Sequence, residues 1–256
     1  MKSLFAFIKK EVLEQLRSGR LFITLALFLM LGIMNPVIAK LTPWLLEMMS
    51  ETLAESGMTV TEVEITAMDS WTQYFKNLPL GLFAFVLLHG SVFTKEYESG
   101  TLVLSLTKGL ERFKVVIAKA GVLTLLWSLC YWLSFGVTYL YNAYYWDNSA
   151  AKSLSLAVVG PWLLGVLAVS LITLFSVLSS TLTGVLLGTG GVVLASYVLS
   201  LFPKPGKYLP TRLLDGAPLL YGTAESEAYT AAMTVTLLLA ILCFAVSIPL
   251  FNKKHL

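Results

Sequence analysis

The sequence has 256 residues, of which 57% are hydrophobic and only 13% are charged, and its mean hydropathy is +0.78. Soluble globular domains are about half apolar and about a quarter charged, so this composition excludes an ordinary water-soluble fold. The net charge of +3 is too small to indicate a nucleic-acid-binding surface, and no nucleic-acid partner is expected.

Six apolar segments are long enough to cross a membrane, because a helix needs about 20 residues to span a hydrocarbon core about 30 Å thick. The predicted spans are residues 21–39, 78–93, 115–139, 154–179, 183–202 and 229–251. The second span is short and is expected to extend back through Tyr74 and Phe75. The sequence therefore predicts an all-α polytopic membrane protein, with residues 1–256 forming one transmembrane domain.

Residues 1–20 precede the first span and have the period of an amphipathic helix. Leu4, Ile8, Val12 and Leu16 recur at helical spacing, and charged residues occupy the other faces. This pattern predicts a helix in the inner membrane interface, with its cations near anionic lipid headgroups. Membrane lipids are therefore expected partners. A second role, framing the docking surface of a protein partner, stays open.

The longest segment between spans, residues 43–77, has two short apolar stripes interleaved with acidic residues. This pattern predicts two interfacial helices at the outer surface. Two roles remain open for them, a lid packed on the spans and direct contact with a substrate. The candidate contact residues are Trp44, Met48, Met68 and Trp71.

Residues 94–114, with the sequence TKEYESGTLVLSLTKGLERFK, combine charged and apolar positions between the second and third spans. Such an amphipathic segment is suited to receive a soluble partner. The alternative is an amphipathic loop that lies on the inner leaflet.

The fifth span is rich in glycine, and the segment after it is rich in proline and glycine. Gly184, Gly188 and Gly191 place small residues near one helix face, which is typical of close packing within a chain or across a dimer. Residues 203–228 contain prolines and glycines that exclude a continuous helix. Their leucines favour a partly re-entrant turn, since irregular backbone at that depth is tolerated where protein buries it.

The distribution of positive charge predicts the orientation. Twelve of the 18 lysine and arginine residues lie in residues 1–20, in residues 94–119 or in the C-terminal tail. The positive-inside rule places these segments and both termini in the cytoplasm, and residues 43–77 and 203–228 outside. We expect a multi-pass protein of the cell membrane, of the bacterial inner membrane type.

The sequence lacks the motifs of soluble catalysis. It contains no G-x-x-x-x-G-K-[ST] phosphate loop, no H-E-x-x-H and no G-x-S-x-G. Its two histidines, His89 and His255, do not make a metal site or a Ser-His relay. No catalytic, metal-binding or cofactor-binding residue is therefore predicted, and active transport would need energy from another polypeptide.

The spans also offer few groups that could bind a coupling ion. Residues 153–203 contain no Asp, Glu, Lys, Arg or His. Carriers driven by ion gradients usually need an ionisable side chain at mid-membrane. His89 is the exception within the second span, where a helix–helix hydrogen bond is favoured over a proton relay.

The central segment resembles the first cytoplasmic loop of type-2 ABC-exporter permeases. Those loops have an E-x-E-x-G-T-L pattern, here residues 96–102, followed by leucines, an arginine (Arg112) and an A-K or G-K pair (Ala118-Lys119). The long first outer segment, the six spans and the amphipathic N-terminus agree with that family. One departure is Thr107-Lys108, where relatives often carry a proline.

The resemblance implies that residues 94–114 are a coupling loop that docks in a groove of an ATPase subunit. Charged residues would make rim contacts, leucine and valine the apolar contact, and Gly100 the turn. The implied coupling residues are Glu96, Tyr97, Glu98, Ser99, Gly100, Thr101, Leu102, Val103, Leu106, Lys108 and Arg112.

The resemblance also implies the assembly, a membrane subunit without its own ATPase site. It would work with two copies of a separate ABC ATPase, which bind ATP and Mg, and with a second copy of this permease or a related one. The uncharged spans favour hydrophobic or amphipathic cargo, first peptides of the toxin or antimicrobial type, then lipids or drugs. The alternatives from other classes are an ATPase-independent carrier and a membrane immunity protein.

Overall fold

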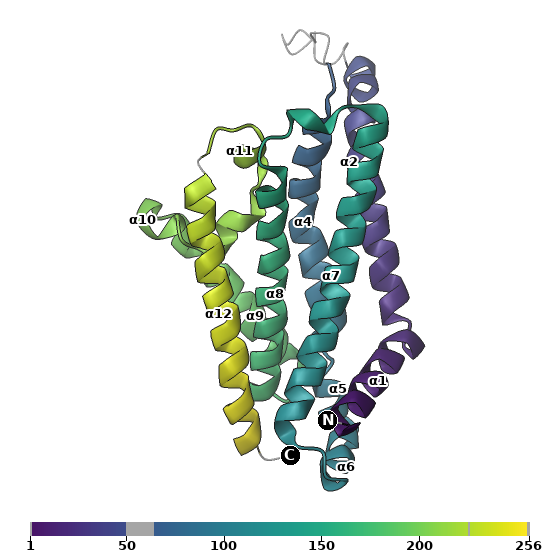
Figure 1. Ribbon diagram of the computed structural model, residues 1–256, viewed down its shortest axis with the longest axis vertical. Coiled ribbons are helices and arrows are strands. Elements are labelled where there is room, and N and C mark those ends of the chain that lie inside the picture. The colour runs from purple at the N-terminus through teal and green to yellow at the C-terminus, as the bar shows by residue number, and fades with distance from the viewer. Residues whose placement is uncertain (1, 50–63, 225, 255–256) are drawn as a thin grey trace.

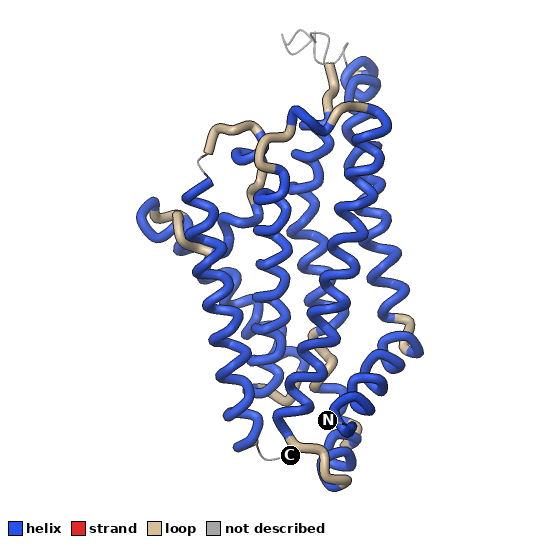
Figure 2. Tube along the Cα trace, viewed as in Figure 1, coloured by secondary structure: helices blue, strands red, loops and turns tan. Residues whose placement is uncertain are grey.

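The computed structural model describes residues 2–49, 64–224 and 226–254, and every regular element in these ranges is helical (Figure 2). Six helices are long and apolar enough to cross a membrane, which confirms the predicted all-α polytopic fold. They run side by side along the long axis, and both termini lie at the same end (Figure 1). The six are α2 (Arg20–Met48), α4 (Ala67–His89), α7 (Arg112–Tyr145), α8 (Leu154–Leu178), α9 (Leu182–Ser200) and α12 (Ser226–Lys253).

Several helices are longer than the predicted spans. Helix α2 continues through Pro36 and Pro43 to Met48, so neither proline ends it. Prolines are tolerated within transmembrane helices because neighbouring helices and polar side chains satisfy the freed backbone groups. Helix α4 extends back past Tyr74 and Phe75, as the sequence predicted.

Helix α8 is the centre of the bundle, and α9 lies at its edge. Within the apolar windows of these spans, 72% of α8 residues are buried but only 11% of α9 residues. Helix α8 packs against α12, α9 and α7, whereas α2 packs mainly against α7 and α4. Gly165 makes the α7–α8 contact possible, because a Cβ there would lie 1.9 Å from the Trp127 ring.

A cluster of aromatic side chains holds α4, α7 and α8 together. Trp71, Tyr74, Trp127 and Tyr131 are each at most 2% exposed. The Tyr131 hydroxyl donates to the Val158 carbonyl over 2.6 Å, and the Trp127 indole N–H donates to the Trp162 carbonyl over 2.9 Å. Large rings therefore fill the core while these polar atoms remain hydrogen-bonded.

Two of the four predicted outer contact residues belong to this core, which corrects the prediction. Trp44 and Met48 are exposed on α2, but Met68 and Trp71 are 8% and 0% exposed. The Trp71 indole N–H donates over 3.0 Å to Asn148 in the short helix η1 (Asn148–Ala150). The physical reason is that α4 already begins at Ala67, so both residues lie on a span that packs into the bundle.

The predicted pair of interfacial helices is absent from the described parts of residues 43–77. Residues 43–48 continue α2, and residues 67–77 belong to α4. Residues 50–63 lie outside the described residues, and with them the middle of the segment that the lid and substrate-contact roles concerned.

The segment after α9 is an interrupted helix, as predicted. It forms α10 (Pro203–Gly206), the short helix η2 (Pro210–Leu214) and α11 (Ala217–Leu220). Leu213, Leu219 and Leu220 are at most 2% exposed. The segment packs on α8, α9 and α12, so its leucines complete the core at this end.

His89 makes the predicted helix–helix hydrogen bond. Its Nε2 lies 3.0 Å from the Thr24 hydroxyl of α2, and both side chains are fully buried. The histidine therefore joins α2 to α4 near the end of the bundle where the two termini lie.

Candidate coupling site

The segment between α4 and α7 forms two short helices separated by a glycine turn. These are α5 (Thr94–Glu98) and α6 (Thr101–Thr107), at the same end of the bundle as the termini (Figure 1). Gly100 has φ +66° and Gly109 has φ +87°, left-handed conformations that favour glycine. The predicted turn at Gly100 is confirmed, and we call residues 94–112 the coupling segment.

Helix α6 has one buried face and one exposed face. Leu102 is 0% exposed and belongs to a core cluster with Phe93 and Val116, whereas Val103 and Leu104 are 41% and 61% exposed. Consecutive helix residues point about 100° apart, so all three cannot face the same partner. Leu102 is therefore not available for the predicted apolar contact, and Leu104, which was not predicted, takes its place on the exposed side.

Glu96 lies inside the chain instead of at the predicted rim. Its carboxylate is 3.1 Å from the Lys119 Nζ of α7, and the same Nζ is 2.9 Å from the carboxylate of Glu11 in α1 (Lys2–Arg17). Lys10 pairs with Glu11 at 3.0 Å and also with Glu96. We call Glu11, Glu96, Lys10 and Lys119 the ion-pair cluster. It corrects the rim contact predicted for Glu96, because the carboxylate is buried and forms its ion pairs within the chain.

The carboxylates of Glu11, Glu14 and Glu96 lie within 4.8 Å of one another, a spacing that could hold a cation. Lys119 and Lys10 already supply positive charge to this group through their ion pairs. The chemistry of the cluster is therefore that of internal ion pairing.

Tyr97 and Arg112 also bind within the chain. The Tyr97 hydroxyl donates to the Ser176 carbonyl over 3.0 Å, and the Arg112 guanidinium donates to the Phe251 carbonyl over 3.0 Å and to the Lys254 carbonyl. Helix C-termini leave carbonyls unpaired, and cations stabilise them. Arg112 therefore caps the C-terminal end of α12. Its guanidinium is bound within the chain and not at the rim of a partner-binding surface, where it was predicted.

Lys254 makes a similar contact at the end of α8. Its Nζ donates to the Val177 carbonyl over 2.9 Å and to the carbonyls of Ser176 and Ser179 over 3.3 Å. Burial lowers the pKa of its ammonium group. The C-terminal tail is thus fastened to α8 beside Tyr97, and the coupling segment contacts α8 and α12 as well as α1 and α7.

Five further residues of the segment are exposed, and we call them together the docking face. They include two apolar side chains, one acidic and one basic side chain. The members of the docking face are Glu98, Thr101, Val103, Leu104 and Lys108. Ser99 is exposed at the turn, and Leu106 is half-buried against the core cluster that contains Leu102.

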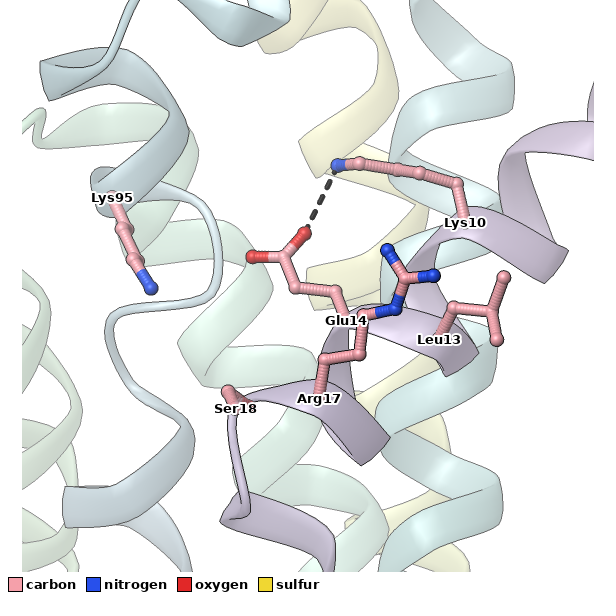
Figure 3. A pocket seen from close by; sticks show the side chains of 6 residues that line it. All are labelled: Lys10, Leu13, Glu14, Arg17, Ser18 and Lys95. Atoms are coloured by element: carbon pink, nitrogen blue, oxygen red, sulfur yellow. Dashed lines mark ion pairs between the residues drawn. The ribbon is translucent and has the colours of Figure 1, made fainter.

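A basic groove of about 480 Å³ lies between α1 and α5 (Figure 3). Lys10, Glu14 and Arg17 line it from α1, and Lys95 lines it from α5. Lys10 and Glu14 are 3.1 Å apart. Burial by itself raises the pKa of the Glu14 carboxyl, but the charge and hydrogen bond of Lys10, with Lys119 and Lys95 nearby, hold this pKa below its ordinary value of 4.5.

A second cavity, of about 210 Å³, lies within the apolar part of the bundle. Its lining includes Phe83, Val86 and Leu87 of α4 and Leu186 and Val193 of α9. No ionisable side chain lines it in the described part of the chain. The cavity is therefore an apolar space at the sparsely covered edge of the bundle.

The three predicted packing glycines of α9 differ in their surroundings. A Cβ on Gly188 would lie 2.2 Å from Phe175, and one on Gly184 would lie 2.0 Å from the Ser179 hydroxyl. These two glycines therefore pack within the chain. A Cβ on Gly191 would meet nothing within 4 Å, so this residue lies on the open side of α9.

Comparison with known proteins identifies the family. A family model described as "ABC-2 family transporter protein" matches residues 5–202, from α1 through α9. No curated protein and no solved structure showed a significant match. Membrane subunits of this family work with an ATPase partner. With six membrane-spanning helices and a match over most of its length, this multi-pass membrane protein belongs to the ABC-2 family of transporter membrane subunits.

Proposed function

We propose that the chain is the permease of an ATP-driven exporter in which two copies of a separate ATPase, which bind ATP and Mg, drive two membrane subunits. The second membrane subunit would be another copy of this chain or a related permease. The observation that carries the proposal is the coupling segment, with an exposed docking face on one side and contacts to α1, α7, α8 and α12 on the other.

The docking face has the composition of a small protein interface. Val103 and Leu104 supply exposed apolar surface, and Glu98 and Lys108 flank it with opposite charges. Interfaces typically have an apolar centre and a polar rim. Closure of two ATPases around ATP would displace the coupling segment. Because this segment connects α4 to α7, its displacement can reorient those helices.

The basic groove extends this surface toward α1. Phe5 and Val12 are exposed seven residues apart, so they share a side of α1 that suits lipid. Lys10 and Arg17 lie on a nearly opposite side, in the groove with Lys95. Positive potential on the side turned away from lipid favours an acidic segment of the ATPase.

The apolar cavity supports a hydrophobic or amphipathic cargo. It is lined by aliphatic and aromatic side chains and borders α9, the span with the smallest buried share. A solute with several charges would find no compensating group there. We propose peptides of the toxin or antimicrobial type as the first substrate class and lipids or drugs as the second, with transport across a cell membrane of the bacterial inner type.

Co-purification tests the partnership with an ATPase. The tagged chain should bring down a nucleotide-binding subunit from its native host, and Glu98→Lys or Leu104→Glu should reduce that yield by about tenfold, as loss of about 1.4 kcal/mol of interface energy would. Glu227→Lys is the matched control, because Glu227 is exposed at the opposite end of the bundle. Absence of any ATPase from the wild-type preparation would contradict the proposal.

Reconstituted vesicles test the cargo. Vesicles that contain both subunits should transport amphipathic peptides only when ATP is present, and the same assay with fluorescent lipids or drugs ranks the second class. Flux through the purified chain alone, driven by an ion gradient, would instead support the carrier alternative.

A further inference from the structure

The most deeply buried cation of the protein's described residues joins three separate elements. Lys119 has a side chain that is 0% exposed, and its Nζ lies 2.9 Å from Glu11 of α1 and 3.1 Å from Glu96 of α5. The same Nζ donates to the Val92 carbonyl over 3.1 Å, in the turn between α4 and α5. The ammonium group of Lys119 on α7 therefore binds both α1 and the start of the coupling segment.

The charges of the ion-pair cluster are of opposite sign and in contact. The carboxylates of Glu11 and Glu96, which are 2% and 5% exposed, face the ammonium groups of Lys119 and Lys10, and Lys10 also pairs with the Glu14 carboxylate at 3.1 Å. Taking such charges out of water costs nearly as much free energy as their attraction returns, so apolar side chains of the same volume would give similar stability. What ion pairs add is a fixed geometry, because each charge must stay close to its partners.

The cluster and the docking face lie on different sides of the coupling segment. Glu96 is buried against α1 and α7, while Glu98, Val103 and Leu104 are exposed. A partner can therefore bind the docking face without disturbing the cluster. Any displacement of α5 would be passed to α1 and α7 through Glu96, because separating Lys119 from Glu96 would leave this buried carboxylate with the partly exposed Lys10 as its remaining ion-pair partner.

We propose that Glu96, Lys119 and Glu11 form a latch that transmits movement of the coupling segment to α1 and α7, with Lys119 as the positioning residue. The proposal rests on the proposed function, since it presumes an ATPase on the docking face. It assigns Glu96 and Lys119 to internal transmission, separate from the residues that bind the partner.

Hydrogen exchange in the assembled complex tests the latch. In the wild type, adding a non-hydrolysable ATP analogue should change exchange in residues 94–107, in α1 and in the first turns of α7. In the charge-free variant Glu11→Gln, Glu96→Gln, Lys119→Met, the change in α1 and α7 should fall about fivefold or more, the lower end of typical coupling between sites. The yield of co-purified ATPase should stay at the wild-type level.

Three further variants sharpen the result. Lys119→Arg keeps two carboxylates bridged by one cation and should retain the wild-type response. Glu96→Gln alone removes one charge from the loop side and should confine the response to residues 94–107, which keeps the test valid if the triple variant does not fold. Lys253→Met, at an exposed lysine of α12, should change nothing.

The outcomes separate the two proposals. An undiminished response in α1 and α7 of a charge-free variant that still binds the ATPase would overturn the latch and leave the proposed function standing. Failure of the wild-type chain to bind any ATPase would overturn both.

Discussion

At the scale of single residues, burial decides what a charge does in this protein. Lys119 is fully buried, so its removal would leave Glu11 and Glu96 with only the partly exposed Lys10 as a counter-charge, and breaking a buried pair costs up to about 3–5 kcal/mol. The Lys10–Glu14 pair is partly exposed, and pairs of that kind contribute about 1 kcal/mol or less.

The pH dependence of Glu14 follows from its lowered pKa. Because folding favours the ionised carboxylate, its contribution is present above the ordinary pKa of 4.5 and is lost as the pH falls through the lower pKa of the folded state. The wild type should therefore be more stable than Glu14→Gln at pH 7, by at most about 1 kcal/mol, and the difference should shrink as the pH falls below 4.5.

Thermal unfolding of both proteins in the same detergent measures this difference, and carboxylates that are distant from residue 14 cancel in the comparison. A difference that stayed constant over this pH range would contradict the assignment of the lowered pKa to Glu14.

At the scale of elements, the coupling segment consists of two short helices joined by a turn. Helices α5 and α6 are only five and seven residues long, too short to be stable alone in water. They persist because Glu96 and Leu102 are buried against the bundle, while the turn at Gly100 changes the chain direction between them. Each short helix therefore has one face fixed and one face free.

The left-handed turn predicts the effect of Gly100→Ala. A Cβ at Gly100 would meet no neighbour within 4 Å, so its cost comes from the backbone alone, about 1–2 kcal/mol for a non-glycine residue at positive φ. We expect faster hydrogen exchange in residues 94–107 and a lower yield of co-purified ATPase. Gly121→Ala is the matched control, since Gly121 lies in α7 and a Cβ there also meets no neighbour. Equal effects of the two substitutions would contradict the turn.

At the scale of the whole molecule, helices with many internal contacts surround a central helix, and one edge is left open. Helix α8 is buried among α7, α9 and α12, and its contact with α7 depends on the missing side chain of Gly165. Helix α9 exposes most of its surface and borders the apolar cavity. The closed side is densely packed, whereas the open side presents exposed apolar surface of α9.

Gly165→Ala tests the closed side. The new methyl group would collide with the Trp127 ring, which is held by its hydrogen bond to the Trp162 carbonyl, and overpacking of this kind costs about 1–3 kcal/mol. Thermal unfolding in detergent should show the loss. Gly136→Ala provides the control, because a Cβ on Gly136 meets nothing within 4 Å; equal stability of the two variants would refute the packing role of Gly165.

Gly191→Cys tests the open side for a second copy of the chain. In a background without the free cysteines Cys130 and Cys243, oxidation in native membranes should link two chains through residue 191. Val185→Cys should not link, because Val185 is 0% exposed within the chain. A monomeric product for both variants would argue against a homodimer through α9 and leave pairing with a related permease.

The sequence by itself determined the fold class, the six spans and the position of the glycine turn between the second and third spans. The length of an apolar segment decides whether it can span a bilayer, and the positions of lysine and arginine decide its orientation. Both are independent of how the helices pack against one another. The motif around Gly100 likewise marks a turn that only glycine adopts readily.

Only the tertiary structure decided which of the motif's residues are exposed and which are buried within the chain. Glu96 and Glu98 look alike in sequence, as do Leu102 and Leu104, but the first of each pair is buried and the second exposed. The reason is that Lys119 and Glu11, distant in sequence, meet Glu96 in space. Side-chain direction on a short helix is fixed by the surface it packs against, and that surface exists only once α1, α7 and the coupling segment come together.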